Sequence, residues 1–119
     1  DATVLCLGVA YKGNVSDTRN TPAEDVVRAL LDAGSKVSAY DPFTDETFGA
    51  KKCRNLDEGV KSADAVVILT DHDEFRLLDL AKLKKLMKRN AVLVDGRRIY
   101  SPAKVKSAGI RYVAVGLGR

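Results

Sequence analysis

The amino-acid sequence predicts an α/β fold in which helices cover both sides of a mainly parallel sheet of about five strands. Short apolar runs alternate with amphipathic helical patterns along the whole chain, which is typical of a three-layer α/β/α sandwich. Residues 65–69 are apolar at consecutive positions, as expected for a strand that is buried on both faces. A chain of 119 residues can bury one ordinary hydrophobic core, so we expect residues 1–119 to form a single domain.

The predicted strands are short runs rich in Val, Leu and Ile. They span residues 3–10, 36–40, 63–70, 91–95 and 111–115, and the segments between them are expected to be helical. Right-handed crossovers through those helices would align the strands in one Rossmann-like sheet. Ligands of such sheets bind beyond the carboxyl ends of the strands, near the point where the strand order reverses. The function is therefore expected to lie in the loops that follow the strands.

The clearest predicted helix spans residues 22–33. Apolar residues recur in it at helical spacing, and Gly34 is placed to end it. Thr21 can cap the first turn, Pro22 suits the first helical position, and Glu24 would complete a Thr-x-x-Glu capping box. Both ends of this helix are thus marked in the sequence.

Two further helices are predicted in the second half of the chain. Residues 78–87 combine an apolar stripe with lysines outside it. Ser101 and Pro102 repeat the combination of a cap and a proline, and the short helix that they begin should end near Gly109.

Composition excludes several classes of protein. A hydrophobic fraction of 45% with 30% charged residues is typical of a globular protein rather than a disordered one. No apolar run approaches the about 20 residues of a membrane-spanning helix, and no signal pattern is present, so we expect a cytoplasmic protein without a membrane partner. The net charge of +4 fits a small anionic ligand as well as it fits nucleic acid.

The two cysteines do not indicate a disulfide framework. Cys6 lies inside an apolar run and is expected to be buried in a strand. Cys53 follows two lysines in a polar stretch, and we expect an exposed thiol there without a reactive role.

The first loop, residues 8–21, is long, polar and followed by a helix amino terminus. Lys12 and Arg19 add two positive charges to the exposed amides and the helix dipole, so the loop is a candidate phosphate site. Its glycines do not have the G-x-G-x-x-G spacing, and Gly13 is not followed by the Lys-Ser or Lys-Thr of a P-loop. The alternative is a solvent-exposed connection in which Asp17 pairs with Arg19.

The second and third loops carry acidic residues. Asp41, at the end of the predicted strand 36–40, could bind a ribose hydroxyl, although a turn initiated by Asp-Pro is the more ordinary explanation. His72 lies between Asp71 and Asp73, but no second His or Cys stands at ligand spacing, so no metal site is expected. We expect Asp71 or Asp73 to cap a short helix instead.

The fourth loop places Arg97 and Arg98 after a buried strand and Gly96. A guanidinium group donates several hydrogen bonds in a fixed plane, which suits phosphate or a uracil-type carbonyl. Arginines at the carboxyl end of a parallel strand lie on the ligand-binding edge, whereas a merely solvated pair is more common on a helix face. We therefore favour a binding role for this pair.

Taken together, three motifs resemble one known family. They are Gly8-Val9-Ala10-Tyr11-Lys12-x-x-Val15-x-Asp17-x-Arg19-x-Thr21-Pro22-Ala23, then Tyr40-Asp41-Pro42, and then Asp95-Gly96-Arg97-Arg98. They are similar to the carboxy-terminal, UDP-binding domain of the UDP-glucose/GDP-mannose dehydrogenase family. The resemblance implies an enzyme that oxidises the C6 alcohol of a nucleotide-linked sugar to a uronic acid with NAD, for polysaccharide biosynthesis. Residues 70–75 are similar to the subgroup that acts on UDP-N-acetyl-hexosamines.

The resemblance also implies roles for single residues. Lys12, with Tyr11 beside it, and Arg97 match positions that contact the UDP-sugar, and Arg19 matches an arginine that reaches NAD bound mainly by another domain. The family's NAD fingerprint, nucleophilic cysteine and other catalytic residues have no counterpart in this sequence, so we assign no catalytic residue. Since the chain starts directly before a strand, we expect it to be a fragment cut at a domain boundary. The full-length protein is expected to be a homo-oligomer.

Two other functions remain as alternatives. A free-standing nucleotide-binding regulatory module, such as a phosphoacceptor receiver, has a similar sheet but needs an acidic pair after the first strand, where this chain has Tyr11 and Lys12. Nucleic-acid binding through the lysines of residues 82–88 has a basic helix in its favour, but the sequence offers no aromatic platform. A solvated charged face explains those lysines better.

Overall fold

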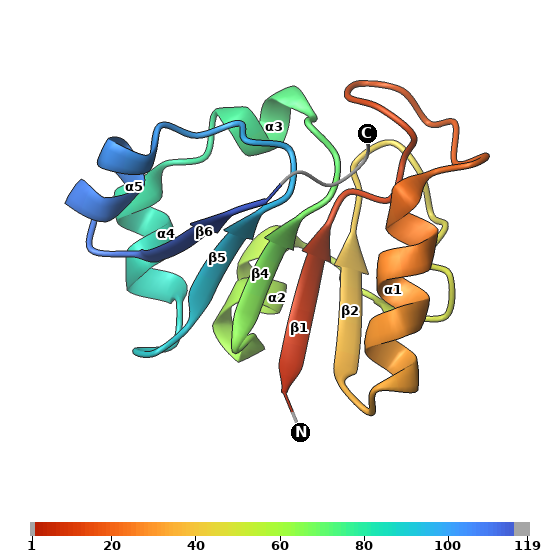
Figure 1. The fold of residues 1–119 in the computed structure, drawn as a ribbon, viewed down its shortest axis with the longest axis horizontal. Coiled ribbons are helices and arrows are strands. Elements are labelled where there is room, and N and C mark those ends of the chain that lie inside the picture. The colour runs from red at the N-terminus through yellow and green to blue at the C-terminus, as the bar shows by residue number, and fades with distance from the viewer. Residues whose placement is uncertain (1, 116–119) are drawn as a thin grey trace.

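A computed structural model describes residues 2–115 and shows one sheet of six parallel strands in the order β3-β2-β1-β4-β5-β6 (Figure 1). The α/β prediction is confirmed, and the five predicted strands all form. The sixth strand, β3, was not predicted, because a pair of exposed lysines carries no apolar pattern. The strands are β1 (Thr3–Leu7), β2 (Lys36–Tyr40), β3 (Lys51–Lys52), β4 (Ala65–Ile68), β5 (Val92–Asp95) and β6 (Arg111–Ala114).

The first and third predicted strands are shorter than expected. The sequence predicted strands over residues 3–10 and 63–70, but pairing stops at Leu7 in β1 and at Ile68 in β4. Gly8 adopts a φ of +92°, which turns the chain out of the sheet although the next residues are still buried. Burial of the residues after Gly8 therefore reflects packing of the loop rather than a longer strand.

The helices cover the two faces of the sheet unequally. In Figure 1, α1 lies in front of the sheet and α2 behind it. Val60 of α2, Phe75 of α3, Leu83 of α4 and Val105 of α5 all belong to the core on the face opposite α1. The helices are α1 (Pro22–Asp32), α2 (Leu56–Ser62), α3 (Asp73–Arg76), α4 (Leu80–Leu86) and α5 (Pro102–Ser107).

The capping of α1 was only partly predicted. Thr21 caps the helix as expected, since its Oγ1 accepts a hydrogen bond from the backbone N–H of Ala23 at 3.2 Å. The expected capping box does not form, because the Glu24 carboxylate accepts from the Arg28 side chain one turn later, at 3.0 Å. A charged partner at i+4 on the exposed helix face draws the Glu24 carboxylate away from the N-cap amide.

The expected cap of α3 was wrong. Neither Asp71 nor Asp73 caps it; His72 occupies the N-cap position and makes no side-chain cap bond. The carbonyl oxygen of the Asn14 side chain instead accepts from the backbone N–H of Asp73 at 3.0 Å. The cap thus comes from a residue 59 positions away in the sequence, which local capping patterns cannot reveal.

Both cysteines are free and buried. Cys6 was expected in a strand interior, and burial raises its pKa to about 12. The expectation of an exposed thiol at Cys53 was wrong, because only 8% of this residue is exposed and it packs in the core with Val60. Burial likewise raises the pKa of the Cys53 thiol, so its reactive thiolate form is disfavoured.

The charged side of α4 takes part in ion pairs with neighbouring segments. Lys82 lies 3.4 Å from an Asp57 carboxylate oxygen, and Lys88, which follows α4, lies 3.2 Å from Asp64. Within residues 2–115, none of the helices is long and apolar enough to cross a bilayer.

Candidate functional site

The strand order reverses between β1 and β4, which are neighbours in the sheet although α1, β2, β3 and α2 separate them in sequence. Parallel sheets of this order bind ligands at that reversal, beyond the carboxyl ends of the strands. The loops that follow β1, β4 and β5 lie at the same end of the sheet (Figure 1). We call this region the loop edge and define it as residues 8–21, 69–72 and 96–100.

The first and third loops of the loop edge pack directly against each other. A Cβ atom on Gly8 would lie 2.3 Å from the Thr70 Cβ, and one on Gly13 would lie 2.5 Å from the Asp71 carbonyl oxygen. Both distances are far below van der Waals contact, so only glycine fits at these two positions. The first and third loops therefore approach each other closely at the reversal between β1 and β4.

The segments that carry Lys12 and Arg97 meet at Asp71. Gly13, next to Lys12, packs on the Asp71 backbone and carboxylate. The Arg97 side chain is 15% exposed, and its Nη2 lies 3.7 Å from the Asp71 Oδ1, while Arg76 donates to the Oδ2 at 3.1 Å. The segments that carry these two residues follow different strands and therefore meet at one end of the sheet.

Asp71 itself is held in the charged form. Burial opposes ionisation of its carboxyl, but backbone N–H groups, the charge of Arg97 and the hydrogen bond from Arg76 outweigh burial and lower the pKa. Its Oδ1 is buried and has no hydrogen-bond partner among the described residues. The carboxylate thus balances part of the positive charge of the loop edge and draws Arg97 toward the first loop.

A residue that the sequence analysis did not single out positions the fourth loop. Asp95 is fully buried at the end of β5, and it accepts hydrogen bonds from the backbone N–H of Arg97 at 3.2 Å and of Tyr100 at 3.0 Å. The Tyr112 hydroxyl donates to the same carboxylate at 2.8 Å. An aspartate directly before Gly96 at a strand end is a turn signal that could have identified this role.

The two adjacent arginines are not equivalent. Arg97 is half-buried beside Asp71, whereas Arg98 is exposed and has a φ of 53° in the left-handed region. The prediction that the pair lies at the carboxyl end of a parallel strand holds for the backbone of both residues, and Arg97 contacts the third loop at Asp71.

Arg19 lies in the exposed half of the first loop. A hollow of about 270 Å³ is lined there by Tyr11, Asp17, Arg19 and Asn20. The Arg19 guanidinium donates to both carboxylate oxygens of Asp17, at 3.1 and 3.0 Å, and lowers the pKa of that carboxyl to about 2. The Arg19 side chain is 87% exposed, so the expected surface pair is present and its guanidinium remains accessible.

Asp41 does not have a free oxygen for a ribose hydroxyl. Its side chain is only 1% exposed; Oδ1 accepts from the Phe43 N–H at 2.8 Å, and Oδ2 accepts from the Val9 N–H at 2.8 Å and the Ala10 N–H at 3.1 Å. The ribose-binding interpretation is therefore wrong, and the Asp-Pro turn is confirmed. The sequence could not show that the same carboxylate also anchors the first loop.

His72 is fully buried and bonded to protein on both ring nitrogens. Its Nδ1 lies 2.8 Å from the backbone nitrogen of Asn14, and its Nε2 lies 2.9 Å from Asp41 Oδ2. Within residues 2–115, no group of three or more His, Cys, Asp or Glu side chains is arranged to hold a metal ion.

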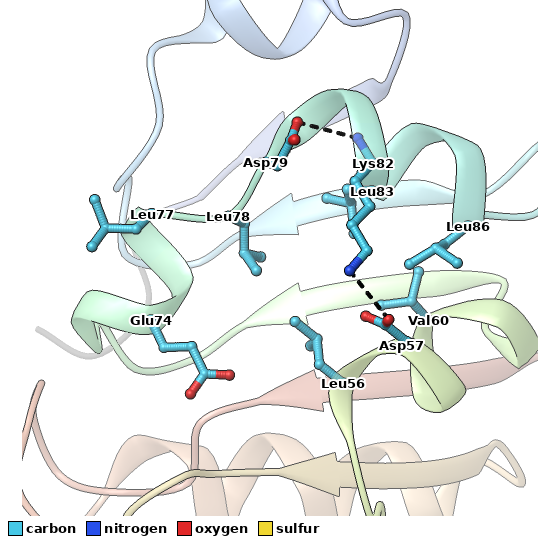
Figure 2. Close-up of a pocket in the computed structure, with 10 residues that line it drawn as sticks. All are labelled: Leu56, Asp57, Val60, Glu74, Leu77, Leu78, Asp79, Lys82, Leu83 and Leu86. Atoms are coloured by element: carbon cyan, nitrogen blue, oxygen red, sulfur yellow. Dashed lines mark hydrogen bonds and ion pairs between the residues drawn. The ribbon is translucent and has the colours of Figure 1, made fainter.

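A larger hollow lies away from the loop edge. It has a volume of about 380 Å³ and runs between α2, α3 and α4 (Figure 2). Figure 2 shows leucines of α2 and α4 facing into it and Lys82 bridging it to Asp57. We call it the apolar groove; it is lined by Leu56, Asp57, Val60, Glu74, Leu77, Leu78, Asp79, Lys82, Leu83 and Leu86.

Comparison with known proteins identifies the family of this chain. The pattern of the UDP binding domain of the UDP-glucose/GDP-mannose dehydrogenase family matches residues 5–102, which run from within β1 to the start of α5 and include all loops of the loop edge. The chain belongs to this family. The resemblance that the three sequence motifs indicated is therefore confirmed.

Individual relatives agree with the family match. The chain is 42% identical to a UDP-glucose 6-dehydrogenase of Rhizobium meliloti over 95% of its own length, and 36% identical to a UDP-N-acetyl-D-mannosamine dehydrogenase of Methanocaldococcus jannaschii over 98%. It spans 27% of either relative. Relatives of both kinds match, so the similarity does not separate the glucose subgroup from the N-acetyl-hexosamine subgroup.

A solved structure of the family has the same fold. The NDP-N-acetyl-D-galactosaminuronic acid dehydrogenase of Methanosarcina mazei superposes with a TM-score of 0.86 at 34% identity. The match covers 98% of this chain and 25% of that protein.

Proposed function

We propose that residues 1–119 form a single domain, the carboxy-terminal nucleotide-sugar-binding domain of an NAD-dependent UDP-sugar 6-dehydrogenase. The full-length enzyme would oxidise the C6 alcohol of the sugar to a uronic acid, and this chain would contribute binding residues but no catalytic group. We further propose that this enzyme is a cytoplasmic homo-oligomer, as the family implies. The family match supports the substrate class, and the arrangement of the loop edge supports the position of the binding site.

The observation that supports the site is the convergence of two cationic segments on Asp71. Gly13, the neighbour of Lys12, lies against this carboxylate in the loop after β1. Arg97 reaches the same carboxylate from the loop after β5, on the other side of β4. A diphosphate is bound best by cations that approach it from separate directions, and arginine adds a planar pair of donors. Tyr11 is half exposed beside Lys12, where its ring can contact the ligand.

NAD is proposed to bind mainly outside this chain, since the NAD fingerprint of the family has no counterpart in the sequence. Gly8 packs against Thr70 and Gly13 against Asp71, so the first and third loops approach each other closely at the strand reversal. The exposed Arg19 guanidinium, beside the hollow at Tyr11, is proposed to reach NAD that another part of the longer protein binds. The hydride-accepting chemistry would thus come from outside these residues.

The test is a titration of the ¹⁵N-labelled chain with UDP, followed by amide chemical shifts. We expect weak binding with shift changes in residues 10–14 and 96–98. Lys12→Gln and Arg97→Gln should each weaken binding by roughly tenfold, because each removes one charge-assisted hydrogen bond. Lys84→Gln, which removes an exposed charge on α4, is the matched control and should bind UDP like the unmodified chain.

Two results would contradict the proposal. Shift changes confined to the apolar groove would place the nucleotide at the wrong surface. Turnover of a UDP-sugar with NAD by this chain alone would show that it holds a catalytic group that we have not assigned.

A further inference from the structure

A buried pair formed by His72 and Asp41 connects three loops of the molecule. His72 follows β4, Asp41 follows β2, and Asn14 belongs to the first loop. The side chains of His72 and Asp41 are 0% and 1% exposed. Such a group is costly to bury unless its hydrogen bonds are all made, so its partners indicate what it holds in place.

The partners of His72 define its protonation pattern. The backbone nitrogen of Asn14 can only donate, so the His72 Nδ1, at 2.8 Å, must be the acceptor. The ring proton of the neutral imidazole then lies on Nε2 and is donated to Asp41 Oδ2 at 2.9 Å. The ring is thus oriented by two bonds of opposite direction, one to each neighbouring loop.

These bonds hold the first loop on both sides of Lys12. Asp41 Oδ2, which accepts from His72, also accepts from the backbone N–H groups of Val9 and Ala10. His72 Nδ1 accepts from Asn14, three residues farther along than Tyr11. The segment of residues 11–13 is therefore bracketed by hydrogen bonds to one buried pair.

Asn14 is held tightly at the far side of the bracket. It has a φ of 62°, in the left-handed region that asparagine tolerates better than most residues. Its side-chain oxygen accepts from the Asp73 N–H at 3.0 Å while its own N–H donates to His72. Two reciprocal bonds thus fix this residue against the start of α3.

From this geometry we propose that His72 is a positioning residue for nucleotide-sugar binding: with Asp41 it fixes the conformation of residues 11–13 so that Lys12 is presented beside Arg97. This role rests on the proposed function of Lys12. It predicts that the loop is ordered before the ligand arrives, so the binding free energy need not be spent on ordering it.

Two variants separate the two bonds. His72→Asn has a shorter side chain whose amide reaches the position of Nδ1 and can still accept from Asn14, but it cannot reach Asp41. His72→Gln reaches toward Asp41 and leaves the Asn14 N–H without its acceptor. We expect His72→Gln to weaken UDP binding by about tenfold and His72→Asn to weaken it less, because the Asn14 bond is the one that closes the bracket.

The control is Phe75→Leu, which loosens the packing around His72 without removing either bond. The Phe75 ring is fully buried, 5.4 Å from the His72 ring. We expect this variant to unfold at a lower temperature but to bind UDP like the unmodified chain below its melting transition. Equal weakening in all three variants would show a general packing effect and would overturn the positioning role.

Measurements on the unmodified chain test the role without any variant. The ring ¹⁵N shifts should show a protonated Nε2 and an unprotonated Nδ1, and the Asn14 amide should exchange slowly with solvent. A protonated Nδ1, or rapid exchange at Asn14, would overturn the inference. If the unmodified chain binds UDP and both His72 variants bind it equally well, only the role of His72 fails. If the unmodified chain shows no shift changes with UDP, the proposed function fails and this role fails with it.

Discussion

The loop edge and the apolar groove are opposite kinds of surface in one small protein. The apolar groove is the larger hollow, at about 380 Å³ against about 270 Å³ for the hollow beside Arg19, and half of its lining residues are leucines. The loop edge combines cations, backbone amides and a buried network of hydrogen bonds from three strands. The larger hollow lies between helices that cover the sheet, whereas the groups that can bind an anion lie at the ends of the strands. The size of a hollow therefore does not identify the anion site in this molecule.

The two regions also differ in what holds them together. Leu83 at the floor of the groove is part of the hydrophobic core, so its contribution is burial of apolar surface. The first loop of the loop edge is held by hydrogen bonds to Asp41 and His72 instead. Substitutions in the two regions should therefore affect stability and ligand binding separately.

The largest expected effect is on stability, in the groove. Leu83 is 4% exposed, and Leu83→Ala should lower the free energy of unfolding by about 2–5 kcal/mol, because it leaves a cavity in the core. Leu77 also lines the groove but is 81% exposed. Leu77→Ala should therefore change the free energy of unfolding by less than about 0.5 kcal/mol. Urea denaturation measures both. A Leu83→Ala chain that is folded but has lost UDP binding would show that the groove and the loop edge are coupled.

A smaller effect is expected from acid at Asp41, the buried carboxylate that anchors the first loop of the loop edge. Burial opposes ionisation of Asp41, but hydrogen bonds from His72 and from the Val9 and Phe43 amides outweigh it and lower the pKa. A folded-state pKa below the unfolded value means that the carboxylate stabilises the fold above about pH 4 and that this contribution is lost as the pH falls through the folded-state pKa.

Asp41→Asn tests this pH dependence. It should cost about 1–3 kcal/mol at pH 7, since it replaces charge-assisted hydrogen bonds, and the difference from the unmodified chain should shrink below pH 4. Asp57→Asn, at the half-exposed pair with Lys82 across the groove, is the control and should cost about 0–1 kcal/mol. Denaturant titrations at several pH values give the comparison. A difference for Asp41→Asn that stays constant down to pH 2 would contradict the assignment.

The smallest effect is expected at the exposed half of the first loop. Asp17→Asn removes a carboxylate that pairs with Arg19 on the surface, so the melting temperature should not change measurably. Loss of this negative charge beside the hollow should leave UDP binding unchanged or slightly stronger. A clear loss of stability or binding would mean that the Asp17–Arg19 pair shapes the site rather than lying beside it.

Much of the candidate site could be predicted because its residues stand at strand ends. The positions of Lys12 and Arg97 follow from the alternation of strands and helices, and the structure places both segments at the loop edge. The turn at Asp41 could be predicted, but its bonds to Val9, Ala10 and His72 could not, because they depend on the packing of the first loop. His72 carried no recognisable role, since its bonds reach 31 and 58 positions along the chain.

The sequence by itself determined five of the six strands and their alternation with helices, the start and end of α1, and the loops that carry the cations. These features depend on apolar periodicity and on capping residues, which act over a few neighbouring positions. Only the tertiary structure decided that the first and third loops pack against each other, that Asn14 rather than Asp71 or Asp73 caps α3, and that His72 accepts a hydrogen bond from Asn14. Those features depend on groups far apart in sequence that must satisfy one another's hydrogen bonds once they are buried together, and local pattern holds no record of such partners.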